Sequence, residues 1–188
     1  IGSTADDALV THCIISNCQE NGSAHVQYCG GGGALAMYAG RVRNCLFVRN
    51  VRETASPNDF RYGTLRVAGG SLENCTIADN SAGSCAGVWA TGGTVVNCVI
   101  VDNVTTIVTP PAAKVCNYPD GMRGCFTPIP VNDSCFTGQI AFKDAAHGDY
   151  APGPGSALKG NGFFCDWMTA AYLAAGFNEE TAACGGRT

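Results

Sequence analysis

The sequence has little charge and no long apolar run. Charged residues make up 14% of 188 positions, the formal net charge is -4 and the hydrophobic fraction is 46%. An acidic chain with so few basic residues does not suit the phosphate backbone, so we expect no nucleic-acid partner. We expect no membrane span, because no apolar stretch approaches the roughly 18 residues that a spanning helix needs. The hydrophobic content also excludes a disordered chain.

Histidine is scarce, and the cysteines form no metal-binding motif. The three histidines are scattered, and no two cysteines are separated by two residues. We therefore expect no metal and no cofactor. Twelve cysteines are many for a cytosolic protein and favour an oxidising compartment, which predicts an extracellular or cell-surface location. The alternative is that buried thiols act as small hydrophobic side chains.

What the sequence does contain is a nine-residue pattern that occurs four times. The pattern reads aliphatic, any residue, Asn or His, Cys, any residue, Ile or Phe, two further residues, and Asn (Cys in the first copy). The copies are 10–18, 42–50, 72–80 and 95–103. In the last three copies a glycine stands two residues earlier, at Gly40, Gly70 and Gly93.

The unequal spacing of the copies indicates a β-solenoid, because extra residues can leave as loops between stacked strands. β-Branched runs such as Val99–Val101 favour strands over helices. Strand alternation puts the Cys and the Ile or Phe of each copy on one side, which we assign to the interior. We expect a further strand before the motif, and so three strands per coil. The candidates for that strand are 34–38, 64–68 and 87–90.

Two asparagine ladders and one cysteine ladder follow from this register. Asn tolerates the left-handed backbone region and can bond to the amide of the next coil. We expect one ladder before the strand, formed by Asn44, Asn74 and Asn97, and one at its far end, formed by Asn50, Asn80 and Asn103. The stacked cysteines would be Cys13, Cys45, Cys75 and Cys98. Coils about 4.8 Å apart allow either free thiols or bridges between coils, and both interpretations stay open.

The element Asn-Cys-x-Ile-x-x-Asn resembles the repeats of right-handed parallel β-helix proteins of bacterial surfaces, and is similar to polymorphic outer-membrane-type repeats. The resemblance covers about residues 9–103, and the tail segments 124–130 and 138–157 resemble elements that follow such repeats. It implies an all-β fold, a right-handed parallel β-helix that ends in a short capping helix.

We expect three segments along the chain. They are regular coils at 1–108, irregular coils and loops at 109–162, and a helical cap and tail at 163–188. Asp166 suits a helix N-cap and Gly176 the position just past its end. A helix there would cover the unpaired last coil. The chain starts at Ile1 with no visible signal peptide, so we expect a processed form or a fragment of a longer protein.

The candidate binding face lies where the long loops 21–33 and 51–62 are expected to leave the coils together. Aromatic side chains with polar neighbours suit carbohydrate, although ordinary loop composition explains the same residues. The residues of this face are His25, Tyr28, Arg52, Glu53, Asp59, Arg61, Tyr62 and Arg66. Arg49, Asp79 and Asp102 occupy equivalent repeat positions and predict an outward charged column, or a weak cation or sugar site.

The function that these patterns favour is a non-catalytic cell-surface or secreted β-helix module. It would be structural or adhesive and present its loops to a protein or carbohydrate ligand. One alternative is a polysaccharide lyase or glycoside hydrolase that acts in a groove on the long-loop face, but no catalytic residues can be assigned. Another alternative is a filament subunit that associates with itself through an open N-terminal coil.

Overall fold

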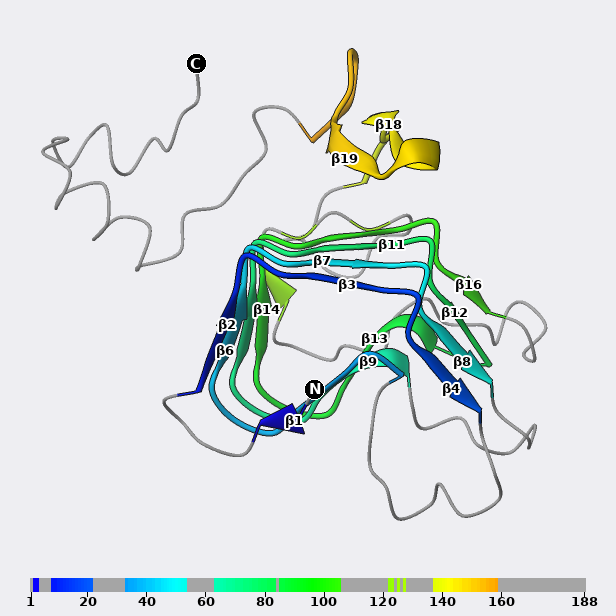
Figure 1. Cartoon of the computed structure of the whole chain (residues 1–188). Coiled ribbons are helices and arrows are strands. Elements are labelled where there is room, and N and C mark those ends of the chain that lie inside the picture. Colours follow the sequence, from blue (N-terminus) through cyan, green and yellow to red (C-terminus); the bar gives the residue numbers. More distant parts are fainter. Residues whose placement is uncertain are drawn as a thin grey trace, which may run out of the picture.

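In the computed structural model the described residues are 2–3, 8–21, 33–53, 63–83, 85–105, 122–123, 125, 127 and 137–158. Their backbone forms four parallel sheets of stacked strands and one antiparallel hairpin (Figure 1). The chain visits the four sheets, here called A to D, in turn and then begins again one layer further on. One such passage is called a coil.

The strands of each sheet come from successive coils and pair in parallel. Sheet A contains β1 (Gly2–Ser3), β5 (Leu35–Met37), β9 (Gly63–Val67) and β13 (Cys85–Ala90). Sheet B contains β2 (Leu9–Thr11), β6 (Arg41–Arg43), β10 (Ser71–Glu73), β14 (Thr94–Val96) and β17 (Met122–Arg123). Sheet C contains β3 (Ile14–Ser16), β7 (Leu46–Val48), β11 (Thr76–Ala78) and β15 (Val99–Val101). Sheet D contains β4 (Gln19–Asn21), β8 (Val51–Glu53), β12 (Ser81–Ala82) and β16 (Val104–Thr105).

The register places equivalent repeat positions directly above one another. In sheet C, Ile15, Phe47, Ile77 and Ile100 are mutual neighbours along the stack. All four are buried in the main apolar cluster together with Cys45, Cys75 and Cys98. The expectation that the Cys and the Ile or Phe of each copy share the interior side is therefore confirmed for the last three copies. In the first copy Ile15 is buried but Cys13 is exposed.

Each of the four coils from β1 to β16 has four strands rather than the three that the sequence predicted. The strands of sheet D follow the last residue of each motif and contain only two or three residues. Strands this short show too little alternation to be recognised from periodicity. The strands expected before the motif are present, as β5, β9 and β13.

The corners on either side of sheet C are made by single residues in the left-handed region, with φ between 49° and 55°. Asn and Asp adopt this conformation more readily than most residues, because their short side chains can bond to nearby backbone. The corner between sheets B and C is made by His12, Asn44, Asn74 and Asn97. The corner between sheets C and D is made by Asn17, Arg49, Asp79 and Asp102.

A buried asparagine ladder crosses the layers beside the second corner. The Asn80 side-chain amide donates to Phe47 O at 3.0 Å and to Asn103 Oδ1 at 2.8 Å. Its Oδ1 accepts from the backbone N and from Nδ2 of Asn50, both at 3.0 Å. In the first coil Cys18 takes the ladder position and donates its backbone N–H to Asn50 Oδ1 at 3.0 Å. Every polar atom of the Asn80 side chain is thus satisfied, which a buried amide requires.

The second expected ladder is also present at the corner between sheets B and C. Asn74 Nδ2 donates to Asn44 Oδ1 at 3.4 Å, and Asn97 Nδ2 donates to Asn74 Oδ1. His12 heads this ladder, with its Nε2 3.3 Å from Asn44 Nδ2. The two ladders hold neighbouring coils in register on both sides of sheet C.

A hairpin near the end of the described chain covers the outer face of sheet C (Figure 1). It consists of β18 (Phe142–Asp144), a short 3-10 turn (Ala145–His147) and β19 (Asp149–Pro152). Its Tyr150 packs with Val48, Ala78 and Val101. In the first coil Ile14, the register partner of Leu46 on the outer face of sheet C, is 72% exposed. No α-helix occurs among the described residues, and the helix expected within 163–188 lies outside them.

The turns between sheets A and B stack closely on one another. Gly70 in one of these turns and Gly155 after the hairpin allow a matched test of this stacking. A Cβ on Gly70 (φ 75°) would lie 2.3 Å from Gly40 O, whereas a Cβ on Gly155 (φ 73°) would meet nothing within 4 Å. Gly155→Ala should therefore cost only the left-handed backbone penalty, about 1–2 kcal/mol. Gly70→Ala should cost several times as much or prevent folding, as measured by urea unfolding. Equal losses would contradict the close stacking.

Candidate functional site

The residues expected on the long-loop face are not brought together within the described part of the chain. Arg52 is buried, with a side chain only 1% exposed, and its Nε lies 2.9 Å from Glu20 Oε2. The two residues are register neighbours in β8 and β4, so the ion pair links the first two coils. The Glu53 side chain and five whole residues lie outside the described part of the chain: His25, Tyr28, Asp59, Arg61 and Tyr62.

Arg66, the remaining residue of that face, lies on the outer surface of sheet A between two aromatic rings. Its Nη1 donates to the Tyr38 hydroxyl at 3.0 Å. Its guanidinium carbon is 5.1 Å from the Tyr38 ring centroid and 5.4 Å from that of Trp89. We call Tyr38, Arg66 and Trp89 the aromatic-arginine platform.

Strand alternation and register build this platform. Arg66 pairs with Trp89 across β9 and β13, and both point outward because their neighbours Leu65, Val67 and Val88 are buried. Tyr38 lies at the end of β5 and is 41% exposed. Tyr38 and Trp89 were not among the residues selected from the sequence. The sequence could have indicated an outward Trp89, because it lies between Val88 and Ala90, and strand alternation puts these two residues inside.

A platform of this kind can bind a ring-shaped polar ligand. Tyrosine and tryptophan offer flat apolar faces with polar atoms at their edges. A guanidinium held against them keeps its charge and its fixed planar arrangement of donors. Together they favour a ligand with an apolar ring face and oxygen acceptors, and a saccharide is such a ligand.

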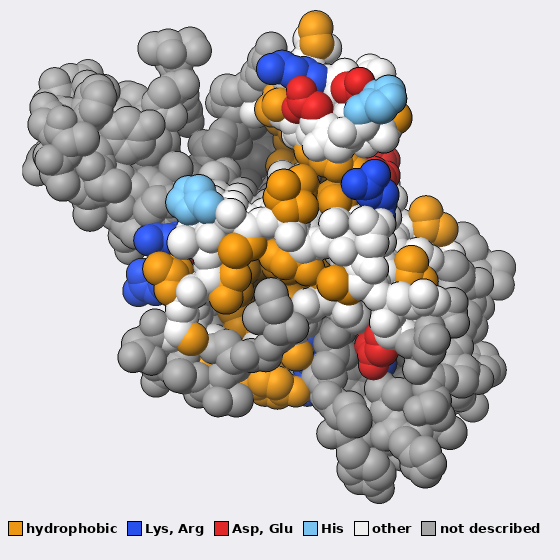
Figure 2. All heavy atoms as spheres, viewed as in Figure 1, with side chains coloured by type: hydrophobic (Ala, Val, Ile, Leu, Met, Phe, Trp, Pro, Cys, Tyr) orange, Lys and Arg blue, Asp and Glu red, His pale blue; other side chains and the backbone are white. Residues whose placement is uncertain are grey.

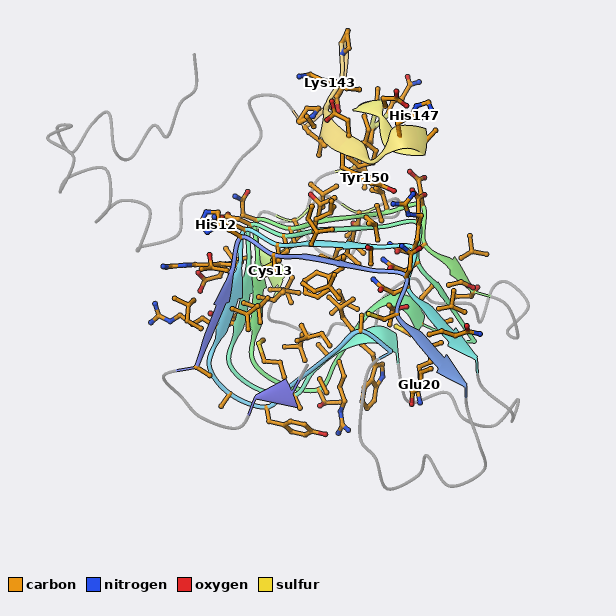
Figure 3. All side chains as sticks on the ribbon, viewed as in Figure 1. His12, Cys13, Glu20, Lys143, His147 and Tyr150 are labelled. Carbon is orange, nitrogen blue, oxygen red and sulfur yellow. The ribbon has the colours of Figure 1, made fainter. Side chains whose placement is uncertain are left out.

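The charged column lies at the corner between sheets C and D, where Arg49, Asp79 and Asp102 are exposed. Tyr150 reaches down from the hairpin and donates its hydroxyl to Asp79 Oδ2 at 2.6 Å (Figure 3). Burial, and then the negative charge of Asp79, raise the pKa of Asp102. Burial, and then the bond to Asp79, raise the pKa of Tyr150 to about 12. The contact with Tyr150 gives Asp79 a structural role, which is to hold the hairpin on the coils.

This contact predicts an alkaline limit to stability. The folded-state pKa of Tyr150 lies above the ordinary value of 10.0, so its contribution is complete below about pH 10 and is lost as the pH rises through about 12. Tyr150→Phe should cost about 1 kcal/mol at neutral pH. The variant should also lose less stability than the wild type between pH 10 and 12, as measured by chemical denaturation. Parallel stability curves for the two proteins would contradict the contact.

An open hollow of about 480 Å³ lies between the hairpin and the corner of sheets B and C. Its floor is formed by outer residues of sheet C, and Asn44 and Asn74 form one wall. The described residues that line it are His12, Cys13, Ile14, Asn44, Cys45, Leu46, Asn74, Thr76, Tyr150 and Ala151. None of these is a carboxylate, so the hollow lacks the paired acids that glycoside hydrolysis uses.

The cysteine ladder has a fifth member that the sequence did not predict. Cys125 Sγ accepts the backbone N–H of Cys98 at 3.4 Å, as Cys98 Sγ accepts that of Cys75. All described cysteines are free thiols. Burial, and then hydrogen bonds with the Cys125 and Cys75 thiols, raise the pKa of Cys98 well above its ordinary value. A thiol with a raised pKa is neutral and poorly reactive near neutral pH, which fits a packing role for Cys98.

Thiol labelling tests this arrangement. Without reductant, iodoacetamide should modify the exposed Cys13 in the folded protein, because its thiol alone in the ladder reaches solvent. Cys75, Cys98 and Cys125 are buried and should react only after denaturation. Peptide mass spectrometry gives both results. Recovery of unlabelled, bridged ladder cysteines after denaturation would contradict the free-thiol column.

The described residues contain no group of three or more His, Cys, Asp or Glu side chains placed to hold a metal ion. No helix in the same part of the chain is long and apolar enough to cross a membrane. Comparison with known proteins finds no matching family model and no significant match among curated proteins or solved structures. Inferences about function therefore depend on the chemistry of the described surface.

Proposed function

We propose that the protein is a non-catalytic, structural or adhesive β-helix module that binds carbohydrate through the aromatic-arginine platform. The observation that carries this proposal is the position of Arg66 between the outward rings of Tyr38 and Trp89. Arg66 and Trp89 lie on paired strands and Tyr38 directly follows β5, so the geometry of the platform is preorganised for binding. A secreted or cell-surface location is part of the proposal.

We further propose that the stacked sheets form a closed right-handed β-helix of the bacterial surface-repeat type. Three observations support this assignment. The strands of four sheets are parallel, two asparagine ladders cross the coils, and a cysteine recurs at the same position of successive coils. A solenoid of this kind displays long, flat outer faces made of side chains from successive coils. Such faces suit extended ligands.

A non-catalytic role is supported by the contacts of the charged side chains. Glu20 bonds to the buried Arg52, and Asp79 bonds to Tyr150. Asp144 Oδ2 lies 2.8 Å from Nδ1 of the exposed His147 within the hairpin. These carboxylates hold structural elements together, whereas polysaccharide cleavage needs acidic or basic groups that converge on a substrate.

Mutation of the platform tests carbohydrate binding. Trp89→Ala should remove most binding on a panel of immobilised oligosaccharides, because a stacked ring supplies much of the contact area. Thr91→Ala, an exposed turn position in the same coil, is the matched control and should bind as the wild type does. Wild-type binding that Trp89→Ala leaves unchanged would overturn the proposed site, and turnover of any saccharide would overturn the non-catalytic role.

Self-association through the first coil is a second candidate function. Strands β2, β3 and β4 are paired on one side only among the described residues. Leu9 is 50% exposed and Ile14 is 72% exposed at this end of the stack, where Figure 2 shows hydrophobic side chains at the surface. Unpaired strand edges can pair with another chain. Ile14→Lys should then abolish any concentration-dependent increase in mass seen by light scattering.

A further inference from the structure

We propose that the ligand of the aromatic-arginine platform is an anionic saccharide that carries uronic-acid carboxylates. This inference rests on the proposed carbohydrate binding and names the ligand class. Arg66 lies against both aromatic rings of the platform. A sugar ring stacked on Tyr38 or Trp89 therefore places its substituents next to a positive charge.

The charges of the described surface are unevenly distributed. On the strands of sheets A and B, the described charged side chains are Arg41, Arg43, Arg66 and Glu73. Glu73 is only 7% exposed and accepts a hydrogen bond from the Ser71 hydroxyl. Sheets A and B thus present a basic face, although the whole chain carries a net charge of -4.

Most of the described acidic residues lie elsewhere. Asp79 and Asp102 are at the corner between sheets C and D, and Asp144 and Asp149 are on the hairpin. In Figure 2 acidic side chains of the hairpin gather at the top of the molecule, above the coils. Arg49 lies at the same corner and Lys143 on the hairpin, so that side carries charges of both signs. An anionic ligand is therefore attracted more strongly to sheets A and B.

Arg41 and Arg43 extend the basic face from the platform into sheet B. Both side chains point away from the interior, because Val42 between them is buried. Arg41 begins β6 three positions after Tyr38, so their Cα atoms are separated by at most about 11 Å. The platform and these two arginines border the same turn.

The spacing of the coils sets the minimum length of the ligand. Tyr38, Arg66 and Trp89 come from three successive coils, and Tyr38 lies two positions beyond Ala36, the register partner of Arg66. The Cα atoms of Tyr38 and Trp89 are therefore at least about 9.6 Å apart, which is twice the strand spacing. A ligand that touches both rings is therefore at least a disaccharide. Its carboxylates can meet planar guanidinium groups, which bind carboxylates with paired hydrogen bonds.

Two hexasaccharides with the same linkage test the inference directly. The probes are cellohexaose and its C6-oxidised counterpart, which differ only in their carboxylates. Calorimetric titration at low salt should show the oxidised hexamer binding at least about tenfold more tightly, the size expected for a charge-assisted contact. This preference should shrink as sodium chloride is added, because salt screens exposed charges.

Variants separate the charge from the stacking surface. Arg41→Gln should reduce the preference for the oxidised hexamer and leave binding of cellohexaose nearly unchanged. Arg66→Gln removes part of the platform and should weaken binding of the oxidised hexamer more than that of cellohexaose. Trp89→Ala should weaken both ligands. Thermal unfolding will reveal whether Arg66→Gln disturbs folding. If it does, Arg41→Gln still tests the inference, because Arg41 lies outside the platform.

The outcomes distinguish this inference from the proposed function. Equal binding of the two hexamers, or a preference that neither arginine variant reduces, overturns the anionic class while carbohydrate binding stands. Absence of Trp89-dependent binding to both hexamers also overturns the inference. In that case the wider oligosaccharide panel decides separately whether the platform binds carbohydrate at all.

Discussion

The rest of the structure depends on one constraint. Each coil must repeat the backbone path of the previous coil, displaced by the distance between neighbouring strands of a sheet. The buried amide of Asn80 can be satisfied only if Asn50 lies one coil before it and Asn103 one coil after it. A shift of one residue would leave these amides unpaired in the interior, at a cost of about 1–3 kcal/mol for each group. The close approach of Gly70 to Gly40 imposes the same register at the turns between sheets A and B.

This constraint separates the interior from the surface. Most inward positions are occupied by aliphatic, aromatic and thiol groups, which pack without needing partners outside the stack. The buried polar side chains Asn80 and Arg52 find their partners in neighbouring coils. Chemistry is therefore confined to outward positions and corners, where side chains of successive coils line up. The corner beside sheet C uses Asp79 to hold Tyr150, and the outer face of sheet A carries Arg66 and its two aromatic neighbours. One periodic scaffold thus supports a structural contact on one side and the proposed binding surface on another.

Much of the fold follows from local pattern, and less of the candidate site does. The inward position of Ile77 beside Cys75 and the ladder through Asn80 depend on alternation and repetition, which a sequence displays directly. Sheet D was not predicted, because its strands are too short to show an alternation of apolar and polar residues. Arg52 was expected at the surface, but its pairing with Glu20 is a contact between coils. Cys125 was missed because it belongs to a repeat whose asparagine is replaced by Gly124.

The sequence by itself determined which residues face inward and which positions stack, because both depend on the short period of a strand and the recurrence of one motif. Only the tertiary structure decided that Tyr38, Arg66 and Trp89 meet, and that the hairpin bonds to Asp79. These contacts join residues from different coils or from a segment outside the repeat. Loops of unequal length separate such residues, so their meeting depends on the register of the stack, which local sequence does not reveal.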